Sequence, residues 1–75
     1  MSPVAAREGS EPTDRELDVL RLLVVHGRAV HQVADDLGIS ARTVRFHVDN
    51  ARRRLGAATI AQAAWLLRDR LELAS

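Results

Sequence analysis

The stretch VADDLGISARTVRFHVDNARRRL, residues 33–55, decides the fold of this chain. Within it, apolar residues recur at helical spacing on both sides of the tetrapeptide LGIS. Gly38 suits the end of one helix, because a residue without a Cβ adopts the left-handed conformation at little cost. Ser40 suits the start of the next, because its hydroxyl can accept a backbone N–H of the first turn. We therefore predict helices over residues 30–37 and 41–55, joined as a helix-turn-helix unit.

The second of these helices has an apolar face and a basic face. At 100° per residue, its apolar residues lie within roughly 40° of one direction; they are Val44, Val48, Ala51 and Leu55. Five residues lie on the opposite side, roughly 100° to 200° away: Arg42, Arg45, Phe46, Asp49 and Arg53. One flank carries Thr43, His47, Asn50 and Arg54, and the other carries Arg52. This strip of arginine and hydrogen-bonding groups suits a helix that enters the major groove of DNA.

The positive charge of the chain is concentrated on this helix, although the overall net charge is only +1. Residues 41–56 hold five Arg and one Asp, a net charge of +4, whereas residues 1–20 hold two Arg and five acids, a net charge of −3. A charge run on an arbitrary helix is usually a solvated face. On the outer side of a helix-turn-helix, a basic patch favours phosphate binding.

Length and composition restrict the chain to one small domain. With 75 residues, 47% of them hydrophobic, it can form a modest core, and without Cys it forms neither disulfides nor thiolate metal sites. Residues 1–12 contain Pro, Gly and Ser without periodicity, so we expect a flexible arm before a folded domain over residues 13–75. The sequence shows neither a membrane-spanning run nor a signal-peptide pattern, so a cytoplasmic protein without membrane contact is expected.

The domain begins with a T-x-x-E capping box. We expect the Thr13 hydroxyl to accept the N–H of Glu16, and the Glu16 carboxylate to reach back to the N–H of Thr13. The helix that follows is predicted over residues 14–25. Val19 and Leu22 fall outside its main apolar stripe. Either the domain wraps this helix on two sides or another molecule docks there.

A fourth helix is predicted over residues 60–72, after a turn at Gly56 and a cap at Thr59. Its core stripe consists of Ile60, Ala64, Leu67 and Leu71. A second patch points elsewhere and is a candidate dimer contact; it consists of Gln62, Trp65, Leu66, Asp69 and Leu73. The alternative is that Trp65 folds back over the core of its own domain.

Five pieces of the sequence, in this order and spacing, resemble the LuxR/GerE-type helix-turn-helix domain of bacterial transcription regulators. They are T-x-R-E-x-x-V-L (residues 13–20), V-A-D-x-L-G-I-S (33–40), T-V-R-x-H-V (43–48), R-R-L-G (53–56) and Q-A-A (62–64). Each piece alone is weak evidence, but the set is fairly specific and spans about two thirds of the chain.

The resemblance implies an all-α, four-helix domain whose third helix enters the major groove. It places Arg45 at base edges or phosphate, with Phe46 and Asp49 beside it. Thr43 and His47 match positions close to the DNA backbone. The fourth helix of such domains is the usual dimer contact, which agrees with the second patch found on residues 60–72.

The sequence departs from the family pattern at two places before the third helix. One extra residue lies between Leu23 and Gly27, so the first helix or its turn differs. Ala29 stands where Ser or Thr is usual, so the second helix loses its expected cap and a phosphate contact.

Asp49 is a further departure, because the aligned position is often basic in the family. Its carboxylate could accept a hydrogen bond from a cytosine amino group, or it could simply lower the affinity for DNA. It could instead pair with Arg45 or Arg53 one turn away and hold them in place. The sequence leaves these three roles open.

These features predict a sequence-specific DNA-binding transcription regulator that acts as a dimer. The expected partners are double-stranded DNA and a second copy of the chain, with RNA polymerase as a further candidate. The predicted DNA-contacting residues are Arg42, Thr43, Arg45, Phe46, His47, Asp49, Asn50, Arg53 and Arg54. The His residues are scattered and no nucleophile–base set is present, so we expect no metal site, no cofactor and no enzymatic activity.

Two other functions are compatible with the sequence. Region 4 of an RNA polymerase sigma factor is a related helix-turn-helix, and the N-A-R-R-R-L run at residues 50–55 fits it. His47 and a full fourth helix fit the LuxR type better. A helical protein-interaction domain would use the apolar residues outside the core stripes and would not bind DNA. The 75 residues include no receiver or ligand-binding domain, so the chain is either part of a larger regulator or free-standing.

Overall fold

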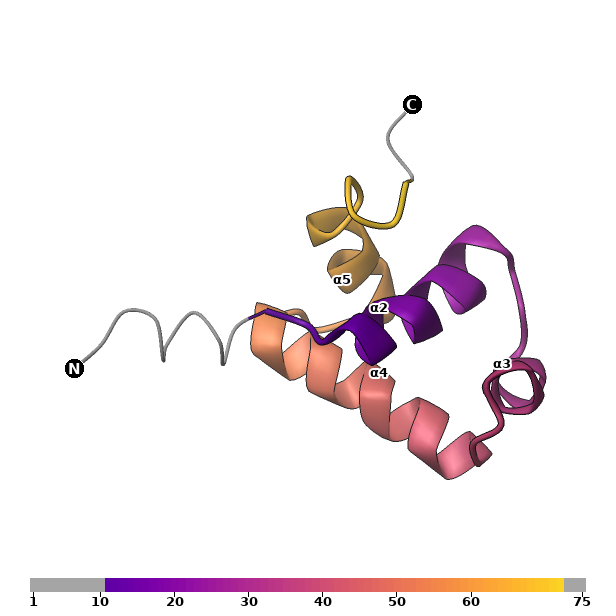
Figure 1. The fold of residues 1–75 in the computed structure, drawn as a ribbon. Coiled ribbons are helices and arrows are strands. Elements are labelled where there is room, and N and C mark those ends of the chain that lie inside the picture. The colour runs from indigo at the N-terminus through magenta and orange to yellow at the C-terminus, as the bar shows by residue number, and fades with distance from the viewer. Residues whose placement is uncertain (1–10, 73–75) are drawn as a thin grey trace.

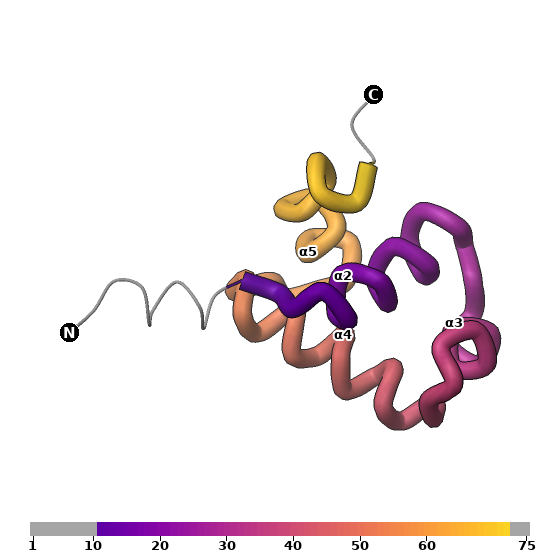
Figure 2. Tube along the Cα trace, in the orientation of Figure 1, coloured from indigo at the N-terminus to yellow at the C-terminus, as the bar shows by residue number. Residues whose placement is uncertain are grey.

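The computed structural model describes residues 11–72, and within that range the chain is all helical. The elements are α2 (Asp14–Leu20), the π-helical turn η1 (Arg21–Val25), α3 (Val30–Leu37), α4 (Ala41–Leu55) and α5 (Ile60–Leu66). Figures 1 and 2 show α2 crossing α4, with α3 beside the start of α4 and α5 rising from its end. The predicted all-α class with four helices is confirmed, with α2 and η1 together as the first helix.

The ends of the predicted domain extend beyond the described part of the chain. Residues 1–10, which make up most of the predicted arm, and residues 73–75 lie outside the described range. No helix within residues 11–72 combines the length and apolar composition needed to span a bilayer.

Both predicted side-chain caps outside the helix-turn-helix are present. The N–H of Thr13 donates to Glu16 Oε1 at 3.0 Å, and the N–H of Glu16 donates to Thr13 Oγ1 at 3.2 Å. At the start of α5, the N–H of Gln62 donates to Thr59 Oγ1 at 3.0 Å. These bonds satisfy backbone donors that have no partner inside the helix, so they fix where α2 and α5 begin.

The first helix, predicted over residues 14–25, is not α-helical throughout. The α-helical part ends at Leu20, and η1 continues it in π-helical geometry. The N–H of His26 donates to the carbonyl of Arg21, five residues back, at 3.2 Å. A π turn takes in one more residue than an α turn. It therefore provides a place for the extra residue that the resemblance to the LuxR/GerE-type domain indicates before Gly27.

The core consists of two clusters, and α4 contributes to both. One contains Leu17, Leu20, Ala51, Ala64, Leu67 and Leu71. The other contains Val19, Val33, Ala34 and Val44. Val19 is wholly buried and Leu22 packs against the second cluster, so the domain itself wraps the first helix on two sides. The alternative, a docked molecule at Val19 and Leu22, is not needed to cover this surface.

The fourth helix, predicted over residues 60–72, is shorter than expected. It ends as an α-helix at Leu66, and turns follow. Arg68 Nη1 donates to the carbonyl three residues before it at 2.9 Å, and Arg21 Nη2 donates to the carbonyl of Arg70 at 2.9 Å. Two arginine side chains thus donate to backbone carbonyls at the end of α5 and in the turns after it. One of these arginines, Arg21, is 49 residues away in the chain from its acceptor. A local sequence pattern could not reveal that contact.

Candidate nucleic-acid interface

The turn between α3 and α4 fixes where α4 begins. Gly38 has a φ of 68°, and the N–H of Ile39 donates back to the carbonyl of Ala34 at 2.9 Å. Ser40 Oγ accepts the N–H of Thr43 at 3.0 Å, and the two hydroxyls are also hydrogen-bonded at 2.9 Å. The predicted left-handed glycine and serine cap are both confirmed.

One side of α4 is buried and the opposite side is exposed, as its sequence predicts. Val44 and Ala51 are fully buried. The five residues expected on the far side are all exposed, and we call them the outer face: Arg42, Arg45, Phe46, Asp49 and Arg53. The flanking residues are half-buried: Thr43, His47, Asn50, Arg52 and Arg54. The outer face therefore lies on the exposed side of a helix whose opposite side packs in the core.

Arg42 and Arg45 are the outer-face arginines that the fold leaves available. Within residues 11–72, neither guanidinium makes an ion pair or a side-chain hydrogen bond. Phe46 is 57% exposed, and its ring contacts that of His47 in a tilted arrangement, with the centroids 6.1 Å apart. Two unengaged guanidinium groups beside an exposed aromatic ring are suited to a phosphate-bearing partner with base edges or methyl groups.

Asp49 pairs with Arg52, and not with Arg45 or Arg53, the partners considered in one of the three roles left open by the sequence. Arg52 Nη2 donates to Asp49 Oδ1 at 2.8 Å, while Arg52 Nη1 donates to the carbonyl of Ala58 at 2.9 Å. Arg52 thus links the outer face to the turn that follows α4. The spacing of three residues between Asp49 and Arg52 is a recognised pairing distance on a helix, so the sequence did contain this signal.

The remaining predicted DNA-contacting arginines differ in their surroundings. Arg53 Nη2 donates to Asn50 Oδ1, so these two side chains form a pair along the edge of the outer face. Arg54 lies half-buried, with Nε 3.3 Å from Glu16 Oε1. The Glu16 side chain is only 3% exposed and also accepts the N–H of Thr13. The structure therefore places Arg54 in the fold, as the counter-charge of a buried carboxylate.

The start of α3 is held without the missing hydroxyl cap. Ala29 cannot accept a hydrogen bond through its side chain, but its N–H donates to Gln32 Oε1 at 2.8 Å. Arg28 forms two hydrogen bonds of 2.8 Å with the two carboxylate oxygens of Asp36. The hydrogen bond and the charge of Asp36 raise the pKa of the Arg28 guanidinium above its ordinary value. These contacts secure the entry to α3, and sequence reasoning missed them.

Apolar side chains also lie behind the outer face. A largely apolar hollow of about 300 Å³ is lined by Leu23, Val30, Arg45, Val48, Asp49 and Ile60. Arg45 and Asp49 thus border side chains from η1, α3 and α5. Within the described range, no three His, Asp or Glu residues are grouped so that they could hold a metal ion.

A second exposed surface lies on α5. Trp65 is 64% exposed and Leu66 49% exposed, so Trp65 does not fold back over its own core. The Arg68 guanidinium lies 4.3 Å from the centre of the Trp65 ring. Gln62 and Asp69 are exposed as predicted, while Leu73 lies outside the described residues. Asp69 lies in the turns after α5, so we restrict the name α5 patch to Gln62, Trp65 and Leu66.

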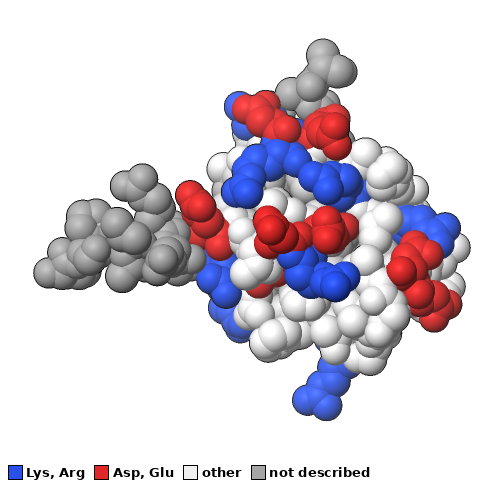
Figure 3. All heavy atoms as spheres, viewed as in Figure 1, with Lys and Arg blue, Asp and Glu red and all other residues white. Residues whose placement is uncertain are grey.

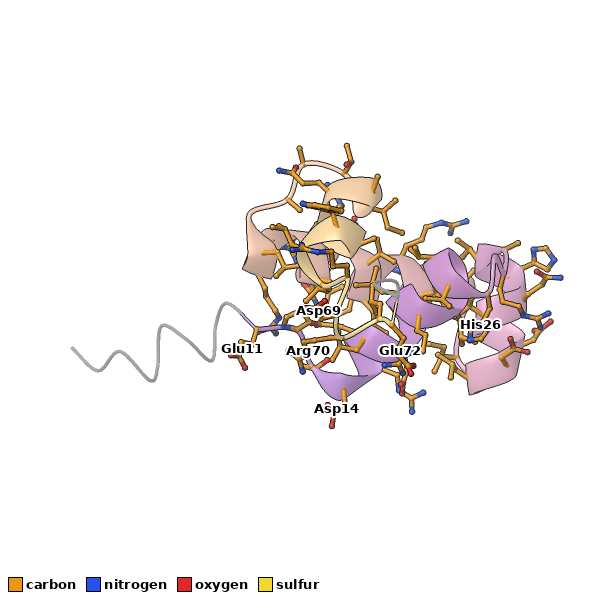
Figure 4. All side chains as sticks on the ribbon, turned by 90° about the horizontal axis from the view of Figure 1, so that it is seen from above. Glu11, Asp14, His26, Asp69, Arg70 and Glu72 are labelled. Carbon is orange, nitrogen blue, oxygen red and sulfur yellow. The ribbon has the colours of Figure 1, made fainter. Side chains whose placement is uncertain are left out.

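The face formed by α2 and the C-terminal turns has mixed charge. Figure 3 shows arginine and acidic side chains alternating across it. Arg21 lies 3.6 Å from Asp18 and 3.7 Å from Glu72, and Figure 4 shows Arg70 and Glu72 beside α2. Because its charges are balanced locally, this face is less suited to phosphate than the outer face of α4.

Comparison with known proteins agrees with this geometry. Residues 12–67 match the family model described as bacterial regulatory proteins, luxR family. The chain is 44% identical over 55 residues to the transcriptional regulatory protein MctR of Rhizobium johnstonii. That alignment covers 72% of this chain but only 25% of MctR, so the chain spans about a quarter of the length of this curated relative. No solved structure gives a significant match.

The matched region contains the whole helix-turn-helix, the capping box before it and all of α5. The family consists of regulators and is not a family of enzymes. The chain therefore belongs to the luxR family of bacterial regulatory proteins, and it carries the DNA-binding helix-turn-helix domain of a transcription regulator.

Proposed function

We propose that α4 enters the major groove of double-stranded DNA with its outer face toward the base edges. The observation that carries this proposal is the pair of unengaged arginines, Arg42 and Arg45, on the exposed side of a helix whose other side is core. An α-helix fits the major groove, and arginine binds both guanine edges and phosphate in a bidentate manner. Arg45 lies nearer the middle of the helix and is the candidate for a base or phosphate contact.

The other predicted DNA-contacting residues fall into groups according to their position on α4. Phe46 and Asp49 lie on the outer face beside Arg45, where they can meet a thymine methyl group or a base amino group. Thr43, His47 and Asn50 lie on the flank, where a helix in the groove passes the sugar-phosphate backbone. Arg42 and Arg53 complete the phosphate contacts, whereas Arg54 acts within the fold through Glu16.

The domain binds DNA as a homodimer in this proposal, with α5 as the contact. The α5 patch presents Trp65 and Leu66 to solvent on a helix other than the one that carries the outer face. Exposed tryptophan is enriched at the energetic centre of protein interfaces. A two-fold dimer would place two α4 helices on half-sites about one helical turn of DNA apart. Leu73, outside the described residues, is a further predicted contact.

Membership of a family of bacterial transcription regulators supports two wider proposals. The chain acts in the cytoplasm, where bacterial DNA is located. RNA polymerase is its candidate protein partner at a promoter, reached by surfaces that remain exposed when α4 is in the groove.

The test is to replace Arg45 after a preferred duplex has been selected. We expect Arg45→Ala to weaken binding to that duplex by ~1–3 kcal/mol and to leave the helical content unchanged. Loss of preference at one base pair would indicate a base contact. A decrease of about one in the slope of log affinity against log salt concentration would indicate a phosphate contact. The matched control is Arg70→Ala, which removes an exposed arginine from the C-terminal turns. Equal affinity of Arg45→Ala and the parent chain would reject the proposed role of Arg45.

A further inference from the structure

Asp49 is an acidic side chain at the centre of a face that is otherwise suited to phosphate. It is exposed on the outer face, with Arg42 and Arg45 before it and Arg53 after it. A carboxylate brought close to DNA is repelled by the phosphates. Its presence therefore needs a favourable contact in the groove, a counter-charge, or both.

The structure supplies the counter-charge through Arg52. Arg52 bonds Asp49 Oδ1 at 2.8 Å and the carbonyl of Ala58 at 2.9 Å, so both ends of its guanidinium are occupied. Its side chain is 32% exposed, compared with 52% for Asp49. Arg52 is therefore anchored between α4 and the following turn, and it holds one carboxylate oxygen in place.

The other oxygen, Oδ2, has no partner among residues 11–72. It belongs to an exposed carboxylate whose orientation is fixed by Arg52. A fixed acceptor of this kind selects among the bases by the groups that each shows in the major groove. Guanine shows only acceptors there, and thymine shows an acceptor and a methyl group. Adenine shows an amino donor beside the N7 acceptor, whereas cytosine shows an amino donor alone.

From this arrangement we infer that Asp49 is a specificity-determining residue that selects cytosine at one position of each half-site, and that Arg52 is the residue that positions it. The inference rests on the proposed entry of α4 into the major groove. Of the three roles that the sequence left open for Asp49, it assigns the contact with cytosine. The carboxylate accepts a hydrogen bond from the cytosine amino group, while Arg52 offsets its repulsion by the phosphates.

The experiment is selection from a pool of random duplexes with sequencing of the bound fraction. The 75-residue chain is compared with Asp49→Ala, Asp49→Asn and the control Asp35→Asn, which removes an exposed acid from α3. For the parent chain we expect one position per half-site at which cytosine is favoured about tenfold. Asp49→Ala should abolish the preference at that position alone. Asp49→Asn should change it to adenine, because an amide pairs with the adenine N6 and N7. Asp35→Asn should leave every position unchanged.

The role of Arg52 is tested in the same selection. Arg52→Ala should reduce the cytosine preference several-fold at the Asp49 position and leave the preferences elsewhere intact. Arg52→Lys should retain part of the cytosine preference, since lysine keeps the positive charge. In an Asp49→Ala background, Arg52→Ala should cause no further change at that position. A merely structural role for Arg52 would weaken all positions equally, and that result would overturn the positioning role.

The outcomes separate this inference from the proposed function. If the parent chain enriches a motif and Asp49→Ala enriches the same one, cytosine selection is rejected and DNA recognition by α4 stands. If Asp49→Ala bound all duplexes more tightly and enriched the same motif, cytosine selection would likewise be rejected, and Asp49 would act only as a charge that repels the phosphates. If the parent chain enriches no motif, both the proposed function and this inference are rejected.

Discussion

At the scale of single residues, the ion pair of Glu16 and Arg54 connects the start of α2 to the end of α4. Glu16 completes the capping box and faces Arg54 at 3.3 Å with a side chain that is only 3% exposed. Glu16→Gln retains an acceptor for the Thr13 N–H but removes the charge opposite Arg54. We expect it to lower the free energy of unfolding by about 2 kcal/mol, because the contact between this buried carboxylate and the half-buried Arg54 loses its charge.

Urea unfolding followed by circular dichroism would measure this effect. The matched control is Asp14→Asn, which removes an exposed acid from the same first turn of α2 and should change stability much less. Equal effects of the two substitutions would show that the charge of Glu16 matters only through the helix dipole.

At the scale of elements, the glycine between α3 and α4 sets the geometry of the helix-turn-helix. Gly38 has a φ of 68°, and a Cβ added there would meet no atom within 4 Å. The cost of Gly38→Ala is therefore conformational, and we expect a loss of about 1 kcal/mol in unfolding free energy. Gly38→Asn should cost less, because asparagine tolerates the left-handed region. Thermal unfolding of the two variants would contradict this account if alanine were as stable as glycine.

The π turn η1 leads to a second prediction about an element. It takes in one residue more than an α-helical turn, and Val25 at its end is 37% exposed. Deleting Val25 should let the first helix continue in α-helical geometry, with retention of cooperative unfolding and DNA binding. Deleting Asp18 from the regular part of α2 is the control, because it rotates the residues after it relative to Leu17 and disrupts the core. Loss of folding in both deletions would show that η1 does not absorb an extra residue.

At the scale of the whole molecule, the sequence predicted what depends on neighbours within one or two turns. The caps at Thr13, Ser40 and Thr59 and the two faces of α4 follow from local spacing, and all are present. Contacts between distant segments could not be derived in this way. Arg54 with Glu16 and Arg21 with the carbonyl of Arg70 depend on how the helices pack, since each pair is far apart in the chain. The end of α5 at Leu66 differs from the predicted end for the same reason.

The assembly of two chains is also a property of the whole molecule. If the α5 patch is the dimer contact, Trp65→Ala should weaken self-association about 30-fold, the effect of losing roughly 2 kcal/mol at an interface. Phe46→Ala is the control, because it removes an exposed aromatic ring from α4 and should leave self-association unchanged. Sedimentation of both variants would measure this, and an equal effect of the two would place the dimer contact elsewhere.

The central claim is that the outer face of α4 recognises duplex DNA. The most direct measurement is binding of the 75-residue chain to a mixed pool of duplexes across a salt series, with sequencing of the retained fraction. We predict that binding weakens steeply with salt, by a logarithmic slope of about 0.9 for each phosphate contacted. The retained duplexes should share a motif of two half-sites about one helical turn apart. Absence of retention at low salt, or retention without any shared motif, would contradict the account.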